Sequence, residues 1–176
     1  NDAAIALSGL TMDSIANKKE AIVENGRFTG MFMESLAEKF RNLIPGPSDD
    51  DLKAYISDAA QKCYAVGLTM VADAGLDAST IQLYDKMQSD DELDMCVYAM
   101  LNPTEENFDQ YLKEGIVRKK SLIVRSIKLY ADGALGSRGA CLINPYKDAP
   151  NEFGILTITP EELGRYCVMA YDNGYQ

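Results

Sequence analysis

A lysine inside a strand-like segment is the residue of this sequence that could most directly do chemistry. Residues 121–131 are rich in β-branched and other apolar residues, as in a strand, and Lys128 lies near their end. Side chains alternate along a strand, so Lys128 shares a face with Ser126 and Tyr130, while the apolar residues between them share the other. If the apolar face packs on helices, Lys128 points into the interior. An amine there is costly unless it is paired, modified or neutral.

Three other charged residues are candidates, and two of them lie where predicted strands end. Asp132 follows the strand of Lys128, and we expect it either to orient a catalytic group or to form a buried salt bridge with that lysine. Asp73 ends an earlier strand and could be a ligand, an orienting group, a helix cap or the ion-pair partner of Lys128. Arg138 could bind a substrate carboxylate or fix its own loop. An edge lysine without a function remains the alternative for Lys128.

The composition excludes several classes of site. The chain has no histidine, so it cannot contain a Ser-His-Asp triad, a Cys-His pair or a zinc site built on imidazole. A net charge of −10 argues against nucleic acid as a partner. No segment approaches the roughly 18 unbroken apolar residues of a membrane span. The four cysteines, none in a CxxC pair, are expected to be buried and free, which fits a reducing compartment such as the cytoplasm.

The first 47 residues predict a small irregular segment. A short helix over residues 2–10 is followed by a hairpin over residues 21–33, because Asn25-Gly26 supplies the positive φ angles of a tight turn. A helix over residues 34–43 then stops at Pro45-Gly46-Pro47. We expect residues 1–47 to be an insertion that precedes the main fold.

Residues 48–176 alternate between helix and strand patterns. A helix that begins near Ser48 is followed by strands over residues 68–72, 93–101 and 121–131, with helices over residues 79–88 and 104–114 between them. A last helix starts at Thr159-Pro160-Glu161-Glu162, a capping box with proline in its first turn. Such alternation predicts βα units around a parallel sheet. About three units make roughly half of a (β/α)8 barrel, whose full form needs about 250 residues.

Several ordered motifs resemble one family, the YtcJ-like branch of the metal-dependent amidohydrolases, which includes N-substituted formamide deformylases. The strongest is Ile127-Lys-Leu-Tyr-Ala-Asp-Gly-Ala-Leu-Gly-Ser-Arg-Gly-Ala140, followed by Pro145-Tyr146 and Gly154-Ile-Leu156. Gly67-Leu-Thr-Met-Val-Ala-Asp-Ala-Gly75 is similar to the family's Gly-Ile-Thr-Ser-Val-x-Asp-Ala-Gly strand. The opening residues 1–11 and the hairpin Glu24-Asn-Gly-Arg-Phe-Thr-Gly30 resemble two further family segments. Together these pieces cover nearly the whole chain.

The resemblance implies a (β/α)8 barrel that holds one or two divalent metals, usually zinc. In the family a fourth-strand lysine, often carboxylated, bridges the metals, and Lys128 occupies that position. The family's histidine ligands have no counterpart here, and we expect them before Asn1 and after Gln176. The resemblance therefore implies an inactive internal fragment of an enzyme that hydrolyses an amide-type C–N bond of a small molecule with metal-activated water.

Two other functions remain open from the sequence. One is a non-enzymatic binding or structural module, and the other is a barrel enzyme that uses Lys128 as a Schiff-base lysine. A partial barrel also has an open sheet edge on each side, so we expect self-association into a homo-oligomer.

Overall fold

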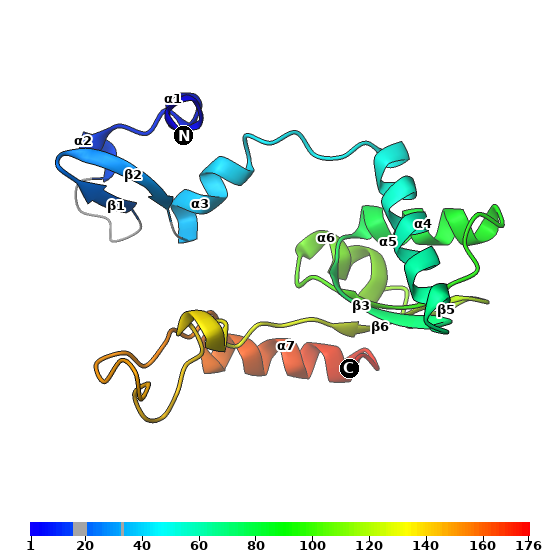
Figure 1. Cartoon of the computed structure of the whole chain (residues 1–176). Helices are drawn as coiled ribbons and strands as arrows, with labels where there is room; N and C mark the ends of the chain where they lie inside the picture. Colours follow the sequence, from blue (N-terminus) through cyan, green and yellow to red (C-terminus); the bar gives the residue numbers. More distant parts are fainter. Residues whose placement is uncertain (16–20, 33) are drawn as a thin grey trace. The chain divides into compact units, whose positions relative to one another are not determined.

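The structure is a computed structural model that describes residues 1–15, 21–32 and 34–176. It divides into two compact units, Asn1–Ser48 and Asp49–Gln176, and Figure 1 shows their elements in sequence colours. Residue 33, the last of the predicted hairpin, lies outside the described part. Within that part, no helix is both long enough and apolar enough to cross a membrane.

The N-terminal unit is built around a hairpin. Its elements are α1 (Asp2–Ser8), α2 (Met12–Ile15), β1 (Ala21–Glu24), β2 (Arg27–Phe32) and α3 (Glu34–Arg41). The turn of the hairpin uses Asn25 and Gly26 at φ 50° and 70°, as the sequence predicts. Leu10 and Leu36 are buried in a small core, and the rings of Phe32 and Phe40 lie 4.5 Å apart beside it.

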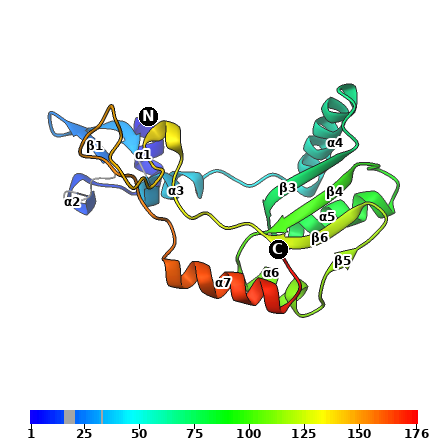
Figure 2. The same cartoon turned by 90° about the horizontal axis from the view of Figure 1, so that it is seen from below.

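The C-terminal unit is a mixed α/β structure. Its elements are α4 (Asp49–Ala65), β3 (Met70–Leu76), α5 (Ala78–Ser89), β4 (Cys96–Leu101), α6 (Glu105–Asn107), the π-helical turn η1 (Phe108–Leu112), β5 (Val117–Arg118), β6 (Leu122–Ile127), the short turn η2 (Leu135–Ser137) and α7 (Pro160–Asp172). The sheet order is β3-β4-β6-β5, which Figure 2 shows from below. The pairs β3-β4 and β4-β6 are parallel, as the βα alternation predicts.

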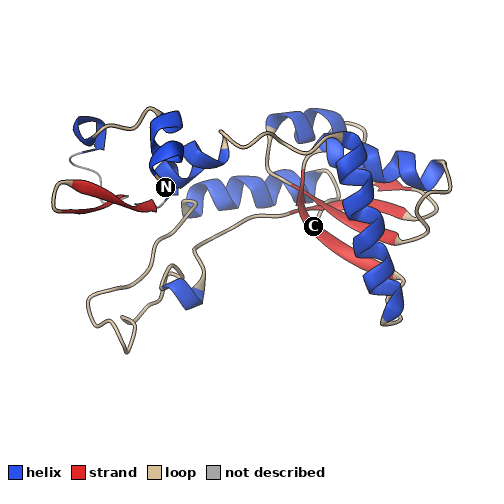
Figure 3. Ribbon diagram, turned by 45° about the horizontal axis from the view of Figure 1, so that its top comes forward, coloured by secondary structure: helices blue, strands red, loops and turns tan. Residues whose placement is uncertain are grey.

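One face of this sheet carries the core. Val97, Ala99, Leu101, Leu122 and Val124 are at most 2% exposed and pack with residues of the helices into one cluster. Figure 3 shows the blue helices of this unit beside its red strands. On the opposite face of β3 the side chains are exposed. Within the described residues, only one face of the sheet is therefore fully covered.

Three expectations from the sequence need correction. The predicted strand over residues 121–131 ends at Ile127, because β4 stops at Leu101 and offers no further partner. The predicted helix over residues 104–114 is a three-residue α6 joined to η1. A short antiparallel strand, β5, pairs with β6 and was not predicted.

The cysteines also differ from expectation in part. All four are free, and Cys63 and Cys96 are partly buried. Cys141 and Cys167 are exposed, so the prediction that all of them are buried is wrong for these two. Both lie outside the sheet, one in the long loop and one on α7, where the core does not reach them.

Candidate active site

The carboxyl ends of three parallel strands meet at one edge of the sheet. This is where barrel enzymes place their chemistry, because the loops that follow the strands gather there. β3 ends at Leu76, β4 at Leu101 and β6 at Ile127, and the backbone N–H of Lys128 still donates to Leu101 O at 2.8 Å. Lys128 and Asn102, which follow β6 and β4, therefore lie at the same edge.

Two irregularities in the ladder decide which side chains point to which face. Between β3 and β4, Ala74 pairs with Met100 and Leu76 with Leu101, so Gly75 is an extra residue, with φ +87°. Between β4 and β6, Arg125 is the extra residue in the same way. A β-bulge of this kind bends the strand and redirects its side chains.

The bulge at Arg125 turns the end of β6. Val124 is buried in the helix-side core, and Ile127 packs against the same core. In a regular strand, residues three positions apart would point to opposite faces, so the bulge has shifted the alternation between them. Ser126 leaves on the other face, where its hydroxyl lies 2.6 Å from Tyr98 Oη. Alternation from Ile127 then directs Lys128 away from the helices.

The side chain of Lys128 lies over the end of β3. Its Cγ is 3.9 Å from the position that a Cβ on Gly75 would take. Its ammonium sits 4.5 Å from the centre of the Tyr130 ring, a cation–π contact. Among the residues that the structure describes, no carboxylate lies within 4.0 Å of Lys128 Nζ, so a salt bridge to Asp73 or Asp132 is not formed.

Asp73 lies on the opposite face from Lys128. It pairs with Ala99 in the ladder, which places it on the helix side, and its carboxylate accepts a hydrogen bond from Tyr84 Oη of α5 at 2.8 Å. Burial, followed by this carboxylate, raises the pKa of Tyr84. Asp73 therefore joins strand to helix through Tyr84, a contact that the sequence did not predict.

Asp132 and Arg138 lie in the long loop after β6. The carboxylate of Asp132 accepts a hydrogen bond from the backbone N–H of Cys141 at 2.9 Å, and its backbone forms an isolated antiparallel β-bridge with Leu156. Asp132 therefore connects the beginning of the loop to its end. Arg138 donates to Asp148 from Nε at 3.2 Å and from Nη2 at 3.0 Å. Asp148 raises the pKa of Arg138, mainly through this hydrogen bond. These contacts are those of the loop-fixing alternative; binding of a substrate carboxylate by Arg138 stays a prediction.

Sequence reasoning missed two residues of this edge. Asn102 donates from Nδ2 to Asp77 Oδ1 at 2.8 Å, and Asn107, fully buried, donates to the carbonyls of Leu76 and Asn102. The Asn102-Pro103 dipeptide directly after a predicted strand was the available signal, since Asn-Pro marks a chain that turns. Nothing in the sequence marks Asn107, which falls inside a helix pattern.

No metal cage is formed by the described residues alone. They contain no group of three or more histidine, cysteine or acidic side chains that could hold a metal ion. Lysine in its ammonium form has no lone pair to offer, so Lys128 could act as a metal ligand only after a chemical change. The donor set of the residues described in the structure does not fit a complete metal site.

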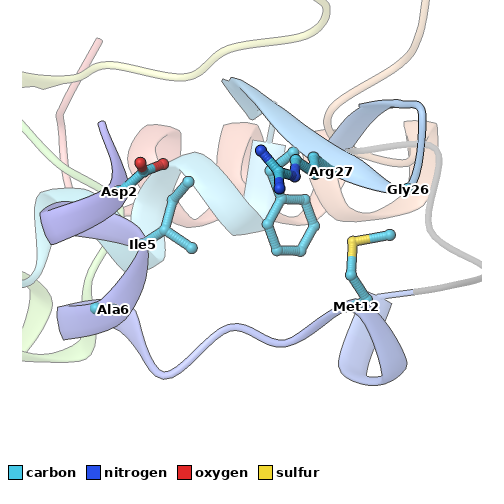
Figure 4. A pocket seen from close by; sticks show the side chains of 7 residues that line it. Asp2, Ile5, Ala6, Met12, Gly26 and Arg27 are labelled. Carbon is cyan, nitrogen blue, oxygen red and sulfur yellow. The ribbon is translucent and has the colours of Figure 1, made fainter.

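A pocket of about 450 Å³ lies in the N-terminal unit, and none of the candidate residues Asp73, Lys128, Asp132 and Arg138 lines it. Its walls come from α1, α2 and the hairpin, and Figure 4 shows Asp2 and Ile5 on one side of it and Arg27 and Met12 on the other. Most of these residues belong to segments 1–11 and 24–30, whose sequences resemble the family.

The chain belongs to the amidohydrolase family, whose model matches residues 1–176. The putative amidohydrolase YtcJ of Bacillus subtilis is 25% identical over 183 residues, covering all of this chain and 34% of its own length. The protein LONG AFTER FAR-RED 3 of Arabidopsis thaliana is 24% identical over 164 residues, covering 86% of this chain and 28% of its own. The chain thus spans about a third of these curated relatives, and the predicted family resemblance is confirmed.

Two solved structures are similar over the whole chain. Uncharacterized metal-dependent hydrolases from Pyrococcus furiosus and Pyrococcus horikoshii each match with a TM-score of 0.76 and 26% identity. The chain covers 36% and 35% of their respective lengths. The fold and the sequence therefore point to the same class of protein.

Proposed function

We propose that this chain is a section of a metal-dependent amidohydrolase whose full-length form hydrolyses an amide-type C–N bond of a small molecule. Water activated by a divalent metal, zinc, would be the nucleophile. The observation that carries the proposal is the position of Lys128, at the carboxyl edge of a parallel sheet and on the face away from the helices. Family membership and metal-dependent hydrolases among its structural neighbours support it.

We propose that the sheet continues into a closed (β/α)8 barrel formed with residues outside this chain. Gln176 supports this, because its N–H donates to Arg125 O and its carbonyl accepts from Ile127 N, the pattern of a parallel neighbour of β6. The exposed second face of β3 supports it too, since parallel sheets are normally covered on both faces. The unit Asn1–Ser48 would be an insertion in that barrel.

Lys128 would contribute to the metal site as a carbamate. Its neutral amine adds to carbon dioxide, a C–N bond forms, and one proton is released to solvent. The product carries two oxygens of the kind that bind zinc. The remaining ligands would come from the rest of the full-length protein, as the lack of a metal cage among the described residues requires. The four free cysteines support our further proposal of a cytoplasmic location.

Metal content and amide hydrolysis of the full-length protein test this function. We expect the zinc-loaded protein to hydrolyse simple amides, and its Lys128→Ala variant to lose bound metal and about 100-fold or more in kcat/KM. Lys147→Ala, in an exposed loop position, is the matched control. The isolated 176-residue chain should bind zinc no more tightly than its own Lys128→Ala variant. Tight zinc binding by the isolated chain that depends on Lys128 would contradict the proposal.

A Schiff-base lysine is the second candidate. It is favoured by the ammonium of Lys128, which has no carboxylate partner in the described part of the chain and contacts only an aromatic ring. Borohydride reduction in the presence of a carbonyl compound would then link that compound to Lys128 covalently. Mass spectrometry of the tryptic peptide decides between the two candidates, because a metal-binding carbamate is not trapped in this way.

A further inference from the structure

Asn102 presents a free amide oxygen to the space beside Lys128. Its Nδ2 donates to the carboxylate of Asp77 at 2.8 Å. A carboxylate only accepts hydrogen bonds, so the nitrogen must face Asp77 and the oxygen must face the other way. The oxygen then lies 2.9 Å from the position of a Cβ on Gly75, where only glycine leaves it room.

The backbone of Asn102 is held in place by hydrogen bonds. Its backbone N–H donates to Leu76 O at 2.9 Å. Asn107, at 0% exposure, donates from Nδ2 to both Leu76 O and Asn102 O at 2.9 Å, so it ties the ends of β3 and β4 together. Buried amides that bond to two carbonyls hold a backbone rigidly, because breaking either bond leaves a polar atom unsatisfied.

Asn102 Oδ1 and the stem of Lys128 border one space. Both lie within 4 Å of the same point above Gly75. Among the described residues, no side-chain or backbone donor bonds to Asn102 Oδ1, although its amide nitrogen donates to Asp77. An oxygen acceptor that is held in place and left without a donor matches a ligand that brings an N–H group.

We propose that Asn102 is a substrate-binding residue that accepts a hydrogen bond from the N–H of the substrate, and that Asp77 and Asn107 are its positioning residues. The inference rests on the proposed function and narrows it, because secondary amides carry an N–H and tertiary amides do not. A site built to bond an N–H rejects an analogue that lacks it, since the bound analogue would displace water from the acceptor and leave it unpaired.

A pair of substrates that differ in one N–H tests the inference in the full-length, zinc-loaded protein. The probes are 4-nitroacetanilide and its N-methyl derivative, followed by release of the nitroaniline. We expect wild type to prefer the N–H substrate by about 100-fold in kcat/KM, after correction for their hydrolysis by hydroxide. Asn102→Leu, of nearly the same size, should reduce that preference to within about threefold. Asn173→Leu, at the exposed end of α7, should leave it unchanged.

The alternatives give distinct results. If Asn102→Leu lowers kcat/KM for both substrates equally, Asn102 is only structural and the inference is wrong. If Asn102→Leu does not fold, Asn102→Ser replaces it, and it should again lose the preference. If wild type hydrolyses neither substrate, the proposed function fails, and calorimetry of the two amides as ligands decides the inference. Equal affinities would overturn it, and tighter binding of the N–H amide would support it.

Discussion

At the scale of single residues, Asp73 shows how a carboxylate can look catalytic and serve the framework. The sequence predicts it at the end of a strand, where catalytic carboxylates in barrels lie, but it is in the middle of β3 on the helix side. There its carboxylate accepts a hydrogen bond from Tyr84 Oη at 2.8 Å. Removing the hydroxyl leaves a partly buried carboxylate without this donor. Loss of the Tyr84 hydroxyl should therefore affect the stability of the protein rather than substrate binding.

Tyr84→Phe should therefore destabilise the protein by about 1.5–3 kcal/mol, the usual loss for a hydrogen bond to a charged group. Urea denaturation measures the change, with the slope of the transition unaltered. Tyr55→Phe on α4, where the ring is 62% exposed, is the matched control and should cost almost nothing. If Tyr55→Phe lowers the free energy of unfolding as much as Tyr84→Phe does, the hydrogen bond to Asp73 does not stabilise the protein.

Tyr175 should make the stability of the protein depend on pH in the alkaline range. Its hydroxyl is directed at the carbonyls of Tyr111 and Gly115, and burial raises the pKa of Tyr175 to about 12 from a normal value of 10.0. Between those values the unfolded chain loses the proton and the folded protein keeps it. The stabilisation is complete below pH 10 and is lost progressively as pH rises toward 12.

We expect the free energy of unfolding to fall between pH 10 and pH 12, and Tyr175→Phe to lessen that fall while lowering stability at neutral pH. Denaturation curves at four pH values over this interval measure it. Absorbance at 295 nm should show the exposed tyrosines ionising first. Identical pH slopes for wild type and Tyr175→Phe would refute the assignment to this residue.

At the scale of elements, the loop between β6 and α7 is fixed by backbone packed on backbone. Gly154 has φ +79°, and a Cβ there would lie 2.0 Å from Ala140 O. Ile155 N–H donates to Gly139 O, and Thr157 N–H donates to Ala131 O. The loop is therefore a closed structure held against the end of β6, which brings Asp132 and Arg138 into fixed places.

Gly154→Ala should displace this loop and cost at least about 2 kcal/mol, since it adds both a clash and a side chain in the left-handed region. Faster tryptic cleavage after Lys147 would report the displacement. Gly136→Ala in the same loop has nothing within 4 Å of the new methyl group and should leave the cleavage rate unchanged. Unchanged cleavage of Gly154→Ala as well would mean that the close approach does not constrain the loop.

At the scale of the whole molecule, the dominant feature is the sheet of the C-terminal unit. Parallel sheets are normally covered on both faces, and this sheet is covered on one by the residues that the structure describes. Met70 at the start of β3 is 49% exposed, and the side chains that follow it on the same face are exposed too. A parallel strand with an open edge and an open face offers both backbone groups and apolar surface to another chain.

The isolated 176-residue chain should therefore self-associate. Light scattering during gel filtration is expected to show species larger than a monomer at micromolar concentration, and Met70→Lys should shift them toward the monomer. Tyr55→Lys on the exposed side of α4 is the control for added charge alone. A compact monomer at all concentrations would show that the exposed face of β3 does not cause self-association.

The sequence determined what depends on neighbours along the chain. The hairpin at Asn25-Gly26 and the capping box of Thr159 and Glu162 formed as predicted, because each uses contacts within about four residues. The βα alternation likewise gave the parallel order of β3, β4 and β6. The family motifs around Lys128 were readable because they are contiguous.

Only the tertiary structure decided which side chains meet at the edge of the sheet. The bulges at Gly75 and Arg125 shift the alternation, so the faces of β3 and β6 could not be read by counting residues across these two positions. Asn102 meets Asp77 across 25 residues, and Asn107 meets Leu76 across 31. Such contacts depend on strand register, and register is set by how the whole sheet packs on its helices rather than by any local pattern.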